Sequence, residues 1–181
     1  MQAGWNCFKL LWLTVIAVAL ATLMVFAVAA ETEDNDTWAT ANSFYIGDSV
    51  SGKVDEELDV DFYRFYVSYP GTLSLVFDHT DLATSDEYWT ITIYDYNKNQ
   101  ISKQKVSGNG TSYELEDVHV NAGTYYVSVA KGSYYTDQSY TFSTSFVYDL
   151  IHNHVYTESL SSKFDKKVFH LPIYSDSYLT F

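Results

Sequence analysis

The sequence predicts an all-β protein, a jelly-roll-like antiparallel β-sandwich of about eight strands that follows an apolar N-terminal helix. Apolar and polar residues alternate with a period of two, and turn residues interrupt this alternation about every 8–12 residues. All 17 tyrosines follow residue 30, and tyrosine favours strands over helices. These observations predict a strand-rich domain behind a short leader.

The first thirty residues are predicted to be a targeting segment. One basic residue, Lys9, precedes an apolar run over residues 10–30, and the run ends in Ala-Val-Ala-Ala. This pattern is typical of a signal peptide that is cleaved after Ala29 or Ala30. The run is also long enough to span a bilayer, so an uncleaved membrane anchor is the alternative. In both cases the remainder of the chain is expected to be secreted or to lie on the extracellular face of the cell envelope.

The composition limits how the exported part is stabilised and what it binds. Cys7 is the only cysteine and lies in the leader, so the fold must rely on its core or on a bound metal. About 150 residues remain after the leader, which is enough for one domain. Without Lys9 the chain has nine Lys and Arg against 23 Asp and Glu, a net charge of −14. Such a surface attracts cations and repels nucleic acid and anionic lipid, so nucleic-acid binding is excluded.

The predicted strands follow one another between turn signals. Turns are predicted at residues 69–71, 97–99, 107–110 and 121–123, where Gly, Pro or Asn occur. The alternation predicts strands at residues 49–54, 61–67, 72–77 and 89–93, around residue 101, and at residues 113–115, 125–129 and 138–148. Only residues 37–42, behind Asn35 and Asp36, favour a short helix.

Two acidic stretches are candidates for a cation site. Residues 31–36 read Glu-Thr-Glu-Asp-Asn-Asp, and residues 55–61 carry five more carboxylates and lead into a predicted strand. Calcium takes six to eight oxygen ligands, which two such groups together can supply. The alternative interpretation of the first stretch is a solvated arm without a ligand, which is the commoner meaning of a charge run.

Several motifs, in order, resemble the bacterial pre-peptidase C-terminal domain. They are Glu31-x-Glu33-x-Asn35-Asp36, Ser51-Gly52, Asp59-x-Asp61-Phe62-Tyr63-x-Phe65-x-Val67, Tyr94-Asp95, Ala122-Gly123-Thr124-Tyr125-Tyr126-Val127-x-Val129 and Tyr140-x-Phe142. The resemblance covers residues 31–148. It implies a jelly-roll sandwich of the kind appended to secreted peptidases and other exported hydrolases, similar to the collagen-binding domains of clostridial collagenases, several of which bind calcium.

The resemblance also implies a set of calcium ligands. The implied ligands are the side chains of Glu31, Glu33, Asn35, Asp36 and Asp61 and the backbone oxygen of Lys53. It further implies a carboxylate three residues before Asp61, where this chain has Leu58. Asp59 or Glu57 would have to replace that ligand.

The macromolecular partner is predicted to differ from collagen. In the collagen-binding members, aromatic residues occur at the positions of Ala130 and Gly132. This chain has no aromatic residue at either position. Tyr134 and Tyr135 form a different candidate aromatic patch for an extracellular protein or a polysaccharide.

No catalytic motif of a serine, cysteine or zinc hydrolase occurs in the sequence. His152, His154 and His170 form a conceivable zinc set, but no carboxylate or cysteine at metal spacing supports it. The expected function is therefore a non-catalytic exported calcium-binding module that binds a partner or assists secreted hydrolases. A membrane-anchored surface interaction protein and the remnant of a larger secreted peptidase are the alternatives.

The predicted organisation has three parts: the leader over residues 1–30, the sandwich over residues 31–148, and a β-rich tail over residues 149–181. Residues 157–165 resemble residues 47–55 in sequence. The tail is therefore either the truncated beginning of a second related unit or an extension that packs on the same sandwich.

Overall fold

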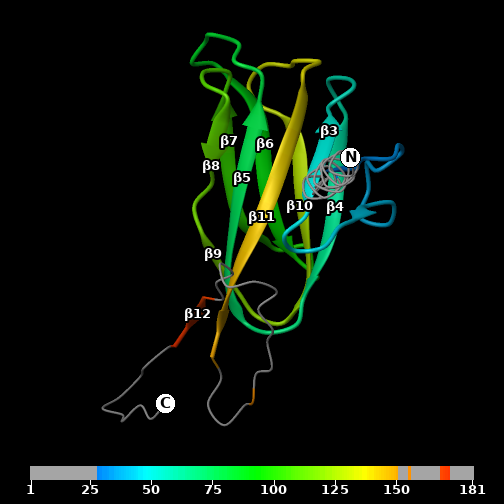
Figure 1. The fold of residues 1–181 in the computed structure, drawn as a ribbon. Helices are drawn as coiled ribbons and strands as arrows, with labels where there is room; N and C mark the ends of the chain where they lie inside the picture. The colour runs from blue at the N-terminus through cyan, green and yellow to red at the C-terminus, as the bar shows by residue number, and fades with distance from the viewer. Residues whose placement is uncertain (1–27, 151–154, 156–167, 172–181) are drawn as a thin grey trace, which may run out of the picture.

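The computed structural model describes residues 28–150, 155 and 168–171, and these form two mixed β-sheets (Figure 1). No residue in these ranges is helical, as the all-β prediction requires. Residues 1–27 of the predicted N-terminal helix lie outside the described residues, and residues 28–30 form a strand. Within the described part of the chain, no helix has the length and apolarity needed to cross a membrane.

The first sheet has the strand order β1-β3-β11-β5-β8, with β12 paired to β11 and β9 paired to β5. Its strands are β1 (Val28–Ala30), β3 (Ser49–Lys53), β5 (Gly71–His79), β8 (Ser112–Glu114), β9 (Val118–Val120), β11 (Ser139–Asp149) and β12 (Phe169–His170). The second sheet has the order β2-β4-β10-β6-β7. Its strands are β2 (Asn42–Ser43), β4 (Val60–Val67), β6 (Glu87–Asp95), β7 (Gln100–Ser107) and β10 (Gly123–Lys131).

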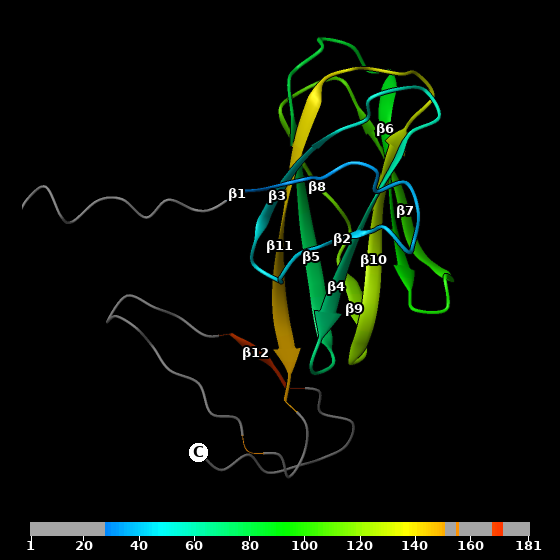
Figure 2. The ribbon, with the colours of Figure 1, turned by 90° about the vertical axis from the view of Figure 1, so that its right-hand side faces the viewer.

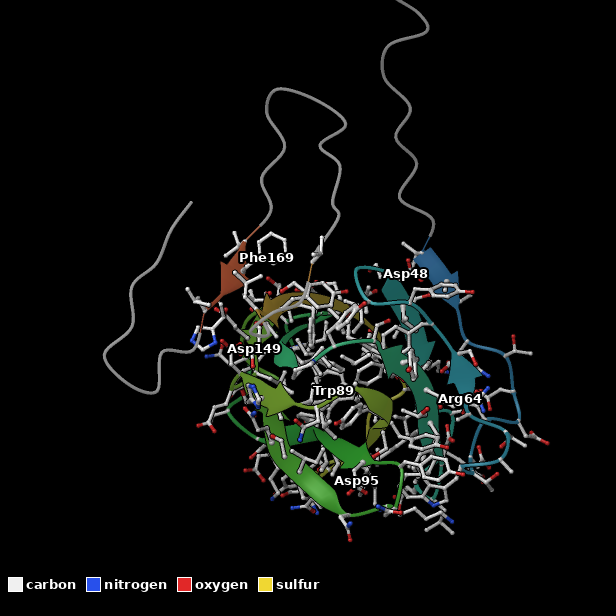
Figure 3. The ribbon with its side chains drawn as sticks, turned by 90° about the horizontal axis from the view of Figure 1, so that it is seen from below. Asp48, Arg64, Trp89, Asp95, Asp149 and Phe169 are labelled. Carbon is white, nitrogen blue, oxygen red and sulfur yellow. The ribbon has the colours of Figure 1, made fainter. Side chains whose placement is uncertain are left out.

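The two sheets face one another across an aromatic core (Figure 2). Along β5 buried and half-buried residues alternate, because successive side chains of a strand point to opposite faces. Ring contacts join the two sheets. The ring centroids of Phe77 in β5 and Trp89 in β6 lie 5.7 Å apart, and those of Tyr63 in β4 and Phe142 in β11 lie 5.0 Å apart. Trp89 is fully buried near the centre of the molecule (Figure 3). The side chains on the inward-facing side of each sheet thus form the core between the two layers.

The structure corrects two fold predictions. The long strands pair antiparallel, but β1 with β3, β2 with β4 and β12 with β11 are parallel, so the sheets are mixed and not purely antiparallel. The helix predicted at residues 37–42 is wrong, because these residues form a turn that leads into β2. The hydroxyls of Thr37 and Thr40 lie 2.8 Å apart and also bond the backbone, which competes with helical hydrogen bonding.

The chain ends add short strands to the first sheet. The predicted cleavage positions, after Ala29 and Ala30, fall in β1, and cleavage there stays a prediction. From the tail, β12 pairs with the end of β11. Asp149 accepts hydrogen bonds from His119 (2.8 Å) and His170 (2.9 Å), and the bond with His119 contributes most to lowering the pKa of this carboxyl. His152 and His154 of the conceivable zinc set lie outside the described residues.

Candidate metal centre

The two acidic stretches converge beside the edges of both sheets. The Glu31 N–H donates to the carbonyl of Ser51 in β3 at 3.0 Å, and the Asn35 carbonyl accepts from the Phe62 N–H of β4 at 3.1 Å. The segment that contains Glu31 and Asn35 is therefore held against β3 at one point and β4 at another. Figure 1 shows this blue segment next to the cyan strands β3 and β4.

Five carboxylates meet at this place in two overlapping groups. Oxygen atoms of Glu31, Glu33 and Asp61 lie within 4.8 Å of one another, and those of Glu33, Asp36 and Asp59 do the same. Glu33 belongs to both groups, so the five side chains form one continuous cluster. Asp59 and Asp61 are buried and the others range from half-buried to exposed, which gives the cluster a buried base and an open mouth.

A chain of hydroxyls fixes the buried base. Tyr63 donates to Glu31 Oε2 at 2.6 Å, Tyr140 donates to Asp61 Oδ2 at 2.6 Å, and the two tyrosine oxygens lie 2.7 Å apart. The Lys53 N–H donates to the second oxygen of Glu31 at 2.5 Å. Three short contacts therefore link the side-chain oxygens of Glu31, Tyr63, Tyr140 and Asp61 in one chain.

The carboxyls of the cluster have raised pKa values. Burial is the largest cause of the raised pKa of Asp61, which lies at about 9; the charges of Glu31, Asp59 and Glu33 also raise it, and the hydrogen bond from Tyr140 lowers it. Burial is also the largest cause of the raised pKa values of Glu31, Glu33 and Asp59. Both effects disfavour the charged forms, and a bound cation would oppose both.

Two buried side chains in the cluster each have an oxygen without a hydrogen-bond partner. Asn35 and Asp61 are 0% exposed, yet Oδ1 of each has no partner among the described residues. A buried polar group without a partner costs roughly 1–3 kcal/mol. A hard divalent cation would use the two orphaned oxygens as ligands, and the all-oxygen donor set fits calcium.

The structure brings together six of the sequence-predicted ligand side chains. They are Glu31, Glu33, Asn35, Asp36, Asp59 and Asp61. Lys53 is adjacent through its bond to Glu31. Leu58 is 86% exposed. Of its two possible replacements, Asp59 lies in the cluster and accepts from the Asp55 N–H, whereas Glu57 forms an ion pair with Lys131 at 3.0 Å.

The predicted tyrosine patch lies elsewhere and is divided. Tyr134 is exposed, with its ring 6.0 Å from that of Tyr88. Tyr135 packs partly against the core and donates to the Asp55 carbonyl at 2.7 Å. One tyrosine of the pair is thus structural, and the other is available to a partner.

Three residues around the cluster were not predicted to take part in it. Tyr63 and Tyr140 read as strand residues, and their hydroxyls contact Glu31 and Asp61 only because β4 and β11 face one another. Gly52 lies close to the same atoms. A Cβ at this position would come within 2.5 Å of Glu31 Oε2 and of the Tyr140 hydroxyl. The Ser51-Gly52 motif was the only sequence signal for this close approach.

The raised pKa values make the free energy of unfolding depend on pH. Carboxyls whose pKa is higher in the folded protein take up protons on folding, so their contribution to stability is lost as the pH rises toward the folded-state pKa. In EDTA we therefore expect the free energy of unfolding to fall from about pH 5 to about pH 9, the folded-state pKa of Asp61. Urea unfolding at several pH values measures the slope, which Asp61→Asn should reduce. Identical slopes in the wild type and this variant would contradict the assignment to Asp61.

Comparisons with known proteins give a likeness of fold. A scan against protein-family models finds no match, and a search of curated proteins finds none either. Among solved structures, the pre-peptidase C-terminal domain of a collagenase from Bacillus anthracis is 18% identical, with a TM-score of 0.45, and the match covers 58% of this chain and 94% of that one. The resemblance predicted from the sequence is thus confirmed as a likeness.

Two further solved structures are similar. The K3 cleaved adhesin domain of Lys-gingipain from Porphyromonas gingivalis is 15% identical, with a TM-score of 0.37, over 53% of this chain and 71% of that one. The carbohydrate-binding module CBM36, solved with calcium and xylotriose, is 11% identical, with a TM-score of 0.33, over 52% and 87%. At these identities the likeness does not extend to ligand or activity.

Proposed function

We propose that this protein is a non-catalytic, exported β-sandwich module that binds calcium and recognises a partner outside the cell. The observation that carries the proposal is the pair of buried, unpartnered oxygens on Asn35 and Asp61 within a cluster of five carboxylates. Cleavage of the predicted leader would leave the module secreted. The strand orders β3-β11-β5-β8 and β4-β10-β6-β7 support a jelly roll, since the chain crosses between the sheets at each step from β3 to β6, again from β7 to β8, and at each step from β9 to β11.

The chain's own residues would share the work of holding the ion. The buried Asp61, Asn35 and Asp59 would bind it from the buried side and the exposed Glu33 and Asp36 from the open side, with the half-buried Glu31 between them. Calcium, when bound, would supply positive charge that offsets the repulsion among these groups. Because the first acidic segment and the start of β4 both contribute ligands, binding would oppose local separation of the N-terminal segment from the sheets.

A structural role accounts for the acidic cluster without a reaction. The Tyr63 and Tyr140 hydroxyls fix two of its carboxylates, and the sequence has no nucleophile motif beside it. We therefore assign the cluster to stability and assign partner binding to another surface.

Calcium is expected to raise the melting temperature of the full chain. At a calcium concentration of about 100 times Kd, ligand linkage adds about 2.7 kcal/mol to the free energy of unfolding, which corresponds to an increase of roughly 5–10 °C. Calorimetric titration measures the affinity and a thermal melt measures the shift. Magnesium is the control, since it prefers six ligands in a smaller octahedral site and should stabilise far less. An unchanged melting temperature in saturating calcium would refute the proposal.

A further inference from the structure

A groove of about 580 Å³ lies on the outer face of the second sheet, and no residue of the acidic cluster lines it. Its walls include Tyr45, Tyr66 and Tyr96, and Arg64 lies among them. On neighbouring strands Arg64 is paired with Tyr126 and Tyr66 with Thr124, so β4 and β10 form the floor. Trp38 covers the adjoining part of this face by packing on Phe62, Tyr94 and Tyr126. The groove is the part of the face that Trp38 leaves open.

The tyrosines that form its walls have exposed side chains on a fixed backbone. Tyr45 is 82% exposed, Tyr66 65% and Tyr96 67%. The backbone of Tyr45 is fixed by two hydrogen bonds with Asp48, and Tyr96 lies in a turn that Asp95 closes through its bonds with Asn99. Tyrosine offers a large contact area at a low entropy cost, and rigid placement lowers that cost further. These three rings are therefore arranged for a ligand and not for the core.

The charge in the groove is opposite to that of the whole molecule. Arg64 is the only arginine of a chain whose net charge is −13, and no acidic residue is among the described residues that line the groove. One guanidinium N–H of Arg64 donates to the Ser43 hydroxyl at 3.0 Å, which fixes the side chain. Its remaining donors match the planar oxygens of a carboxylate. Figure 3 shows Arg64 at the outer side of the molecule, far from Trp89 at the centre.

The chemistry of the lining identifies the class of ligand. Aromatic rings provide flat apolar faces for sugar rings, and the hydroxyls of Ser43, Ser68 and Thr124 suit a ligand rich in hydroxyls. A nucleic acid needs several cationic groups to neutralise its phosphates, whereas this groove has one. A basic peptide would bring further positive charge next to Arg64, and no acidic residue of the groove would offset it. An acidic sugar chain satisfies the rings, the hydroxyls and the single cation together.

We propose that this groove binds a polysaccharide that contains uronic acid, with Tyr45, Tyr66 and Tyr96 against the sugar rings and Arg64 on a carboxylate. This inference deepens the proposed function, because it assigns the module's partner to a surface separate from the calcium cluster. The acidic remainder of the surface limits how many further anionic groups can lie close by, so the groove selects sugars with spaced carboxylates.

The test is calorimetric titration of the full chain with a hyaluronan hexasaccharide, in which glucuronate alternates with N-acetylglucosamine. Chitohexaose, which has N-acetylglucosamine at every position, is the neutral probe of equal length. We expect the hyaluronan probe to bind and chitohexaose to bind at least about tenfold more weakly, since a charge-assisted hydrogen bond is lost. Arg64→Gln should abolish this preference, and Tyr66→Ala and Tyr96→Ala should each weaken binding about tenfold or more.

Tyr134→Ala and Tyr113→Ala are matched controls, since both tyrosines are exposed but lie outside the groove. Neither substitution should alter binding. Loss of binding in Tyr134→Ala together with unchanged binding in the groove variants would overturn the proposal in favour of that loop. Equal affinity for both sugars, tight binding of a polyproline peptide instead, or no binding of either sugar would also overturn it. Parallel calcium melts separate these failures from failure of the calcium site, since Arg64→Gln should leave the calcium response unchanged.

Discussion

Asp61→Asn is expected to reverse the order of stability between two buffers. In EDTA at pH 8 the variant should melt at the same temperature as the wild type or higher, and in saturating calcium it should melt lower. Asp61 is a fully buried carboxyl beside Glu31, Glu33 and Asp59, and these surroundings raise its pKa to about 9. Without an ion, a neutral amide of the same shape avoids the cost of protonating that group on folding at pH 8 and can bond the Tyr140 hydroxyl in place of the protonated acid.

With calcium present, the same amide is a poor replacement for an anionic ligand. The variant should therefore lose most of the stabilisation of about 2.7 kcal/mol that the wild type gains at 100 times Kd. Differential scanning calorimetry of both proteins in both buffers measures the reversal. Asp117→Asn, at an exposed position outside the cluster, should follow the wild type. Asp36→Ala should lose the calcium response without the gain in EDTA, because Asp36 is exposed. A calcium response retained in Asp61→Asn would refute the assignment of Asp61 as a ligand.

The long strands could be predicted from the sequence because their pattern is local. In β5 the period of two is visible in the residues themselves, and core burial follows from it. The parallel pairings of β1 and β2 were not predictable, because strands of two or three residues carry no periodic signal. The turn at residues 37–40 was misread as the start of a helix. Hydrogen bonds of the Thr37 and Thr40 hydroxyls and the pairing of Asn42 with β4 favour the turn instead.

The carboxylates of the candidate site could be predicted, whereas the tyrosine hydroxyls that bond them could not. Acidic residues in two stretches are visible in a sequence, and the resemblance supplied the pairing of Asn35 and Asp36 with Asp61. The hydroxyl chain through Tyr63 and Tyr140 joins residues 77 positions apart and depends on the two sheets facing one another. The groove around Arg64 likewise combines residues of β2, β4 and β10 with residues of the loops between strands, so no single segment indicates it.

Gly52→Ala is expected to destabilise the fold and to weaken calcium binding, although glycine offers no side-chain ligand. A Cβ at this position would approach Glu31 Oε2 and the Tyr140 hydroxyl to 2.5 Å and would also collide with the Tyr63 hydroxyl. Real Cβ contacts are much longer, so the methyl group must displace the hydrogen-bonded tyrosines that lie between the sheets. Overpacking of this kind costs about 1–3 kcal/mol, and broken buried hydrogen bonds add to it.

Urea unfolding in EDTA measures the first effect, with an expected loss of about 3 kcal/mol. Calorimetric titration measures the second, and we expect at least about a tenfold weaker affinity because Glu31 is pushed from its position. Ser51→Ala is the matched control, since Ser51 precedes Gly52 in β3 and its side chain points to the opposite face of the strand. That variant should differ little from the wild type in either measurement. If Gly52→Ala matched Ser51→Ala in both, Glu31, Tyr63 and Tyr140 would not be packed tightly over this strand, and the fixed base of the proposed calcium site would be lost with them.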